Sequence, residues 1–202
     1  SDALTAHLLT LSHFMRQTDP RFTLPPAEQA QMQQALIAFV TGKLQRTFWS
    51  PQPDMTARKL SAIAALALDG KATPALLDSL DIDPVRWPTH SVLDWLTVLE
   101  HVQVPGRAQR QQEAWHILRN RLAYQGTQVG FSTDAQDHWW WLMQGPDVNA
   151  ARLLLATIGQ AEWDAERPRL VTGLLARQKS GAWATTTANL WAGLALRQFS
   201  ST

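Results

Sequence analysis

The chain contains no cysteine and has no concentration of charge of one sign. Without cysteine it can form neither disulfide bonds nor Cys-ligated zinc sites, and it has no thiol nucleophile. Its formal net charge is +1, and its lysines and arginines are scattered along the sequence. Binding of nucleic acid by phosphate neutralisation needs a concentrated basic surface, so we expect no nucleic-acid partner.

Long apolar runs are missing as well. The longest nearly apolar run, residues 60–68, stops at Asp69 and falls well short of the ~20 residues that a membrane-spanning helix needs. No signal peptide is visible, and the sequence begins with Ser1 instead of methionine. We therefore expect a segment excised from a longer protein.

The remaining composition predicts one globular unit. A length of 202 residues suits a single domain with a substantial core; 45% of the residues are hydrophobic and 17% are charged. Apolar residues recur with the period of helices, and the strict alternation of half-buried strands is almost absent. We predict a single all-α domain over residues 1–202.

Prolines, glycines and capping residues divide this pattern into about ten helices, with boundaries good to about two to four residues. Asp54 and Asp147 are expected to cap the helices that follow them, and another helix is expected at residues 138–143. Polar, amphipathic helices take turns with Ala/Leu-rich ones, and the two kinds can form an outer and an inner ring. We predict a partial α/α toroid of alternating inner and outer helices. The polar helices are expected at residues 27–46, 106–121 and 165–179, and the Ala/Leu-rich ones at residues 60–68, 150–158 and 187–196.

The end of the chain carries the most specific motif. Residues 181–187 read Gly-Ala-Trp-Ala-Thr-Thr-Thr and lead into a helix of small apolar residues. A Gly-x-Trp turn of this kind is typical of the connections between helices in α/α toroids. We expect Trp183 to pack over the start of the last helix, and Thr185 or Thr186 to cap it.

Three consecutive tryptophans are the oddest local feature. On a helix, Trp139, Trp140 and Trp141 would lie about 100° apart and together cover about 200° of its surface. Either this helix packs on two sides or one ring is exposed for a partner. Packing is the favoured interpretation, because aromatic side chains are most often buried. With Trp183, these residues are the candidate interaction or packing aromatics.

Candidate metal and catalytic side chains form no recognisable motif. The six histidines include no His-x-x-x-His pair, so we expect no metal and no cofactor. Asp78, Asp81 and Asp83 precede a proline and suit turn and N-cap chemistry. An enzyme would need facing carboxylates drawn from Asp78, Asp81, Asp134 or Asp137, but we predict no catalytic residue. The histidines are His7, His13, His90, His101, His116 and His138.

Together these segments resemble the thioester-containing α/α-toroid domain of the α2-macroglobulin and complement family, specifically its large bacterial members. Leu-Thr-Ala at residues 4–6 resembles an inner helix of that family, and an outer helix follows at residues 28–44. Residues 143–155 are also in the bacterial style, and residues 181–196 resemble the closing Gly-x-Trp-x-Thr-Thr helix. The resemblance implies the later two-thirds of a thioester-type domain, taken from a much larger protein.

The resemblance also implies a partner class and a location. Members of this family trap proteases after a bait region is cut, so target proteases and other domains of the parent protein are the expected partners. The expected location is the periplasm or cell envelope of a Gram-negative bacterium, and the resemblance is compatible with a parent anchored to the membrane as a lipoprotein.

The reactive part of the family's mechanism has no counterpart in these residues. The internal thioester is formed by a Cys-x-Glu-Gln motif, and this chain has no cysteine to form it. The motif either lies upstream of Ser1 or has been lost. No histidine occurs between His13 and His90, where the thioester-activating histidine would fall, so we favour the thioester-less branch.

The first functional hypothesis is therefore a non-enzymatic domain of a bacterial α2-macroglobulin-like protease inhibitor, with a structural and conformational role. An α/α-toroid enzyme, either terpene cyclase-like or a glycan hydrolase, is one alternative. A helical protein-interaction module is the other.

Overall fold

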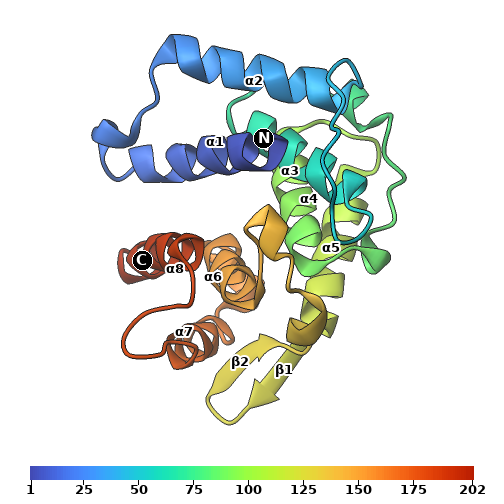
Figure 1. Ribbon diagram of the computed structural model, residues 1–202. Helices are drawn as coiled ribbons and strands as arrows, with labels where there is room; N and C mark the ends of the chain where they lie inside the picture. Colours follow the sequence, from blue (N-terminus) through green and yellow to red (C-terminus); the bar gives the residue numbers. More distant parts are fainter. The chain divides into compact units, whose positions relative to one another are not determined.

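The computed structural model describes all of residues 1–202 and confirms the predicted all-α class. It contains eight α-helices, six short 3-10 turns and a single two-stranded hairpin (Figure 1). The chain divides into two compact units, unit 1 from Ser1 to Ile117 and unit 2 from Leu118 to Thr202. The single domain over 1–202 and the toroid arrangement stay predictions.

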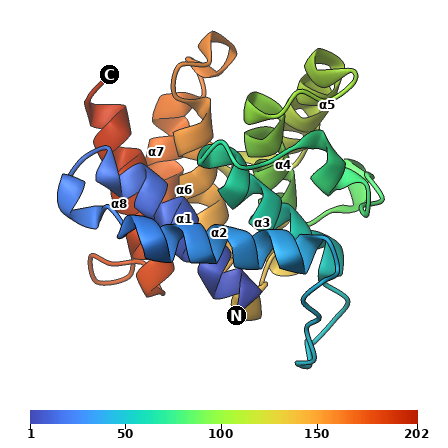
Figure 2. The same cartoon turned by 90° about the horizontal axis from the view of Figure 1, so that it is seen from above.

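Unit 1 is built around α3, whose small and branched apolar residues let neighbouring helices approach it closely. Helix α3 contacts α1, α2 and α4 (Figure 2). Leu60, Ile63 and Leu66 are fully buried along it. The predicted burial of residues 60–68 on most sides is therefore confirmed. The helices of this part of the chain are α1 (Asp2–Arg16), α2 (Pro26–Val40), α3 (Met55–Leu68), α4 (Thr89–His101) and α5 (Arg107–Asn120), the last continuing into unit 2.

The predicted helix over residues 27–46 is too long at its end. Helix α2 stops at Val40, because Gly42 adopts a left-handed conformation with φ of 79°. Its backbone N–H donates to the carbonyl of Phe39, which is the geometry of a glycine-terminated helix. The residues after Gly42 are thereby released into a loop that runs to Asp54.

A cluster around Asp69 ties three helices of unit 1 together. Asp69 follows the end of α3, and its carboxylate accepts hydrogen bonds from Arg16 of α1 at 3.1 Å and from Gln29 and Gln33 of α2 at 3.2 and 3.0 Å. His13 Nδ1 lies 3.8 Å from the same carboxylate. Burial alone would raise the pKa of Asp69, but these four partners outweigh it and lower the pKa to about 2.

Unit 2 contains a β-hairpin that the sequence pattern did not predict. Strand β1 (Leu122–Gln125) pairs antiparallel with β2 (Gln128–Phe131), with Leu122 opposite Phe131. The helices of this unit are α6 (Pro146–Thr157), α7 (Arg167–Ala176) and α8 (Thr186–Ser200). Helix α6 packs against α7 and α8, and β2 packs against α7.

The contact between β2 and α7 depends on Gly173. A Cβ atom at this position would lie 2.4 Å from the carbonyl oxygen of Val129, so only glycine lets the helix and the strand come this close. Val129 itself is buried. The side of the hairpin formed by β2 is therefore covered at this point by backbone of α7.

The connection from α7 to α8 is a tight turn followed by a capped helix. Ser180 and Gly181 both have positive φ, and Lys179 and Ala182 exchange backbone hydrogen bonds across them. Thr185 then caps α8 by accepting a hydrogen bond from the backbone N–H of Ala188 at 3.1 Å. The predicted threonine cap is therefore confirmed, with Thr185 in that role.

Candidate functional site

Unit 2 holds a cavity of about 910 Å³. Strand β2, the start of α6 and the end of α7 line it, together with the turn that leads to α8. Its size lies within the range of pockets that take small ligands, roughly 300–1,000 Å³. Trp140 and Trp183, two of the four predicted aromatics, are among its lining residues.

One wall of the cavity carries an ion-paired arginine. Arg177, directly after α7, donates from Nε to Asp147 at 2.6 Å and from Nη1 to Asp134 at 2.8 Å. Burial lowers the pKa of Arg177, but the hydrogen bonds and the negative charges of the two carboxylates outweigh burial and raise it. Arg177 therefore stays charged and fixes two carboxylates at the cavity wall.

The tryptophans divide between packing and exposure. The expected helix at residues 138–143 is wrong, because only Trp140–Leu142 form a 3-10 turn. Trp139 is buried and stacks on Trp141 with ring centroids 5.0 Å apart, whereas Trp140 is 71% exposed. Trp140 meets this stacked pair only at an edge, since its ring lies nearly perpendicular to that of Trp141 with centroids 5.8 Å apart.

Trp183 is held by hydrogen bonds at both its ring and its backbone. Its indole N–H donates to the carbonyl of Leu174 in α7 at 2.9 Å. Its backbone N–H donates to the side chain of Asn189 in α8, whose amide nitrogen donates back to the carbonyl of Trp183. The ring is thereby fixed between α7 and α8, at the edge of the cavity.

The candidate carboxylates lie in different places. Asp134 lines the cavity, whereas Asp137 is buried and accepts a hydrogen bond from Thr133 at 2.6 Å. Asp78, Asp81 and Asp83 belong to unit 1. Asp83 is half exposed and stands at the N-cap of a 3-10 turn, but its carboxylate makes no cap bond and pairs with Arg86 at 3.2 Å instead.

Sequence reasoning missed Asp147 and Arg177 as site residues. Asp147 is predicted as the N-cap of a helix, but Gly145 occupies that position and the carboxylate of Asp147 binds Arg177 instead. The two residues are 30 positions apart, so no local spacing links them. The one signal was an acid directly after Gly-Pro at the start of a helix.

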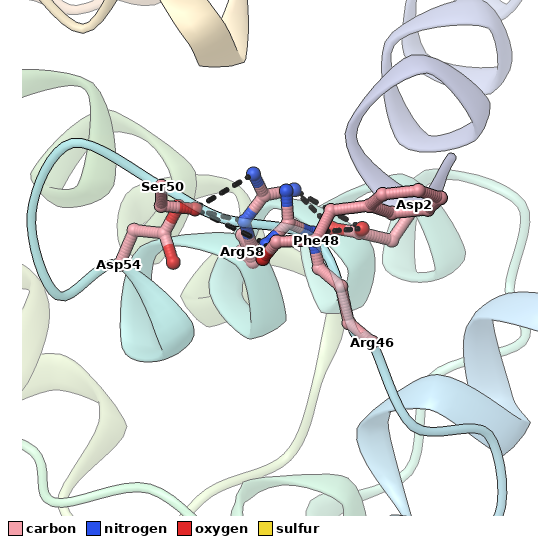
Figure 3. Close-up of polar contacts among 6 residues, drawn as sticks. All are labelled: Asp2, Arg46, Phe48, Ser50, Asp54 and Arg58. Atoms are coloured by element: carbon pink, nitrogen blue, oxygen red, sulfur yellow. Dashed lines mark hydrogen bonds and ion pairs between the residues drawn. The ribbon is translucent and has the colours of Figure 1, made fainter.

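Unit 1 holds a second polar cluster, centred on Arg58 of α3. Figure 3 shows the Arg58 guanidinium between Asp54, which accepts from Nε at 2.7 Å, and Asp2, which accepts from Nη1 at 3.0 Å. Arg58 is 3% exposed. Arg46 also approaches Asp2, at 3.5 Å. Asp54 was expected to cap α3, but its carboxylate binds this arginine, which lies one helical turn later.

The Arg58 cluster anchors a loop with an exposed aromatic tip. Arg46 donates to the carbonyl of Phe48 at 2.7 Å and to the hydroxyl of Ser50 at 3.1 Å (Figure 3). Between these anchors, Phe48 and Trp49 are 76% and 80% exposed. We name these two residues the aromatic tip. They are more exposed than any other large hydrophobic residue of the chain.

The histidines and the helix lengths give two further results. Among the histidines, His7 and His90 are buried, His90 in the first turn of α4. No three His, Cys, Asp or Glu side chains are brought together in a group that could hold a metal ion. No helix combines the length and the apolar character that crossing a bilayer requires.

Comparison with known proteins gives no further assignment. No family model, no curated protein and no solved structure matches the chain.

Proposed function

We propose that this chain is a helical domain of a bacterial α2-macroglobulin-like protease trap, with a structural and conformational role and without a thioester. The observation that carries the proposal is the closing motif, which forms a defined turn. Asn189 of α8 bonds to Trp183 and Thr185 within it, and the Trp183 indole bonds to Leu174 of α7, so the turn holds α7 and α8 together. The partners would be target proteases and other domains of the parent, in the periplasm or cell envelope.

The aromatic tip supports a docking role within such a trap. Exposed large aromatics cost solubility and are typical of contact sites, and tryptophan is enriched among the residues that dominate interfaces. Hydrogen bonds on both sides of Phe48 and Trp49 order the loop before it binds, which lowers the entropy lost on docking. A neighbouring domain of the parent protein is the proposed partner of this loop.

The test is protease inhibition by the full-length parent protein. A protease enclosed by a trap still cleaves a small peptide substrate but loses access to a large protein substrate. We expect this split for the wild-type protein, and a weaker split for the double variant Phe48→Ser/Trp49→Ser. Val85→Ser, at another exposed apolar residue of unit 1, is the matched control and should inhibit like the wild type.

Two outcomes would contradict this proposal. With the wild-type protein added, a protease that keeps its full activity on both substrates would argue against a trap. A protease that loses the same share of its activity on both would do so too. Full inhibition by the double variant would leave the trap standing but remove the docking role of the aromatic tip.

The absence of a thioester is tested separately. Methylamine opens an internal thioester and leaves a methylamide on the former glutamine, which mass analysis of the full-length protein detects. We expect no adduct. An adduct would show that a thioester is supplied by residues outside this chain, which has no cysteine.

One observation favours the enzymatic alternative. Asp134 and Asp147 line the same cavity, and paired carboxylates are what an α/α-toroid glycan hydrolase or terpene cyclase uses for acid and base catalysis. Both are bound to Arg177. In this alternative the chain releases product from a glycan or isoprenoid substrate, and Asp134→Asn and Asp147→Asn each abolish the release. Turnover that survives both substitutions would exclude this pair.

A further inference from the structure

The charged residues that line the cavity of unit 2 balance one another. Arg177 and Lys179 are its cationic residues, and Asp134 and Asp147 are its acidic ones. Arg177 already pairs with both carboxylates. A strongly anionic or cationic ligand would therefore face as many side chains of like charge as of opposite charge. The lining suits a ligand without net charge.

The other polar side chains of the lining both donate and accept hydrogen bonds. Gln125 and Gln128 of the hairpin and Gln178 after α7 each offer an amide oxygen and an amide nitrogen. Sugar hydroxyl groups have the same double character, and each can donate one hydrogen bond and accept two. The carboxylates bound to Arg177 add further acceptors at the same wall.

The aromatic residues offer flat apolar surface beside these groups. Trp140 is 71% exposed at the cavity, and the indole N–H of Trp183 is already used within the fold, so its remaining accessible surface is apolar. A sugar ring has an apolar face of C–H groups and an edge of hydroxyl groups. Tryptophan beside amides and carboxylates matches both.

A peptide bound as an added strand fits this cavity less well. Such binding needs a strand edge with free backbone groups. The candidate edge is β2, but the carbonyl of Val129 faces the backbone of α7 at Gly173. The two are so close that a methyl group added to Gly173 would collide with the carbonyl oxygen of Val129. An extended peptide would have to displace the helix.

We infer that the cavity of unit 2 is a binding site for a neutral oligosaccharide, with a sugar ring on Trp140 and hydroxyl groups on the Gln128 side and the Arg177 side. This inference does not depend on the proposed trap function. It assigns a ligand class to a site that would serve equally in a non-enzymatic domain.

The test is calorimetric titration of the 202-residue chain with three neutral tetrasaccharides, cellotetraose, maltotetraose and tetra-N-acetylchitotetraose, and with the anionic tetragalacturonate. At least one neutral sugar should bind with a Kd on the order of 1 mM or tighter, and more tightly than the anionic one. Trp140→Ala should weaken this binding by about tenfold or more. Trp49→Ala, which removes the similarly exposed tryptophan of unit 1, should leave it unchanged.

Three results would overturn the inference. These are no binding of any of the three neutral sugars, tighter binding of tetragalacturonate, and equal effects of Trp140→Ala and Trp49→Ala. Since Trp140 is exposed, its substitution should leave the far-ultraviolet circular dichroism unchanged, and Gln128→Ala gives a second exposed variant with the same expected loss. None of these outcomes bears on protease inhibition, so the two proposals fail independently.

Discussion

Gly173 allows a direct test of the close packing in unit 2. In Gly173→Ala, the new methyl group would lie 2.4 Å from the carbonyl oxygen of Val129. An ordinary C···O contact is about 3.3 Å, so α7 and β2 would have to separate by about 0.9 Å. Forcing an extra methyl group into a packed interior costs roughly 1–3 kcal/mol, and the upper part of this range applies because the opposing atom belongs to the backbone.

Alanine also gains stability as the better helix former, by about 1 kcal/mol over glycine. The net expectation for Gly173→Ala is therefore a loss of about 2 kcal/mol in the free energy of unfolding. The matched control is Gly193→Ala in α8, where the added methyl group would meet no atom within 4 Å. That control should gain about 0.5–1 kcal/mol.

Urea denaturation followed by circular dichroism measures both variants. The reasoning depends on the opposite signs of the two changes, since both replace glycine by alanine inside a helix of the same unit. A Gly173→Ala variant as stable as Gly193→Ala would refute the close approach of α7 to β2.

Three further predictions concern the polar clusters and the helix cap. The folded-state pKa of Asp69 is lowered to about 2, so its stabilisation is complete above the pKa of the unfolded chain and is lost as the pH falls toward 2. Asp69→Asn should lose about 2 kcal/mol of the free energy of unfolding at pH 7, and in urea titrations its difference from wild type should shrink below about pH 4. A difference that stays constant with pH would contradict this prediction. Arg58→Met removes the cation shared by two buried carboxylates and leaves only Arg46 beside Asp2, so it should cost about 3–5 kcal/mol, with faster chymotrypsin cleavage at the aromatic tip; unchanged cleavage would count against the anchoring of that loop. Thr185→Ala should lose about 1 kcal/mol and Thr186→Ala less than about 0.5, in the same urea assay; equal losses would place the cap elsewhere.

The helices could be predicted from sequence where local chemistry decides them. The double proline at the start of α2 and the threonine before α8 act within a few residues of the positions they define, so their effect is visible in the sequence. The hairpin was missed because each strand has four residues, too few for alternation to stand out among helical patterns. Its signal was Gly126 between two short runs that contain aromatic and branched residues.

The candidate site was predicted less well than the fold. Trp140 and Trp183 were singled out from the sequence and line the cavity, but their positions depend on contacts made by the folded chain. Arg177 reaches Asp134 across 43 positions, and no periodicity encodes that distance. The carboxylate of Asp147 is suited to cap a helix locally, but in the fold it binds Arg177 instead.

The Asp69 cluster has a kinetic consequence. Its hydrogen bonds link residues 36 to 53 positions apart, so they can form only after α1, α2 and α3 have come together and the loops between them have closed. We expect these bonds to be absent from the folding transition state, so that Asp69→Asn speeds unfolding and hardly changes the rate of folding. A chevron plot in which Asp69→Asn folds more slowly instead would place the cluster in the folding nucleus. Because its bonds form late, Asp69 slows the unfolding of unit 1 and so lengthens the time that unit 1 resists a protease that cuts each chain as soon as it unfolds.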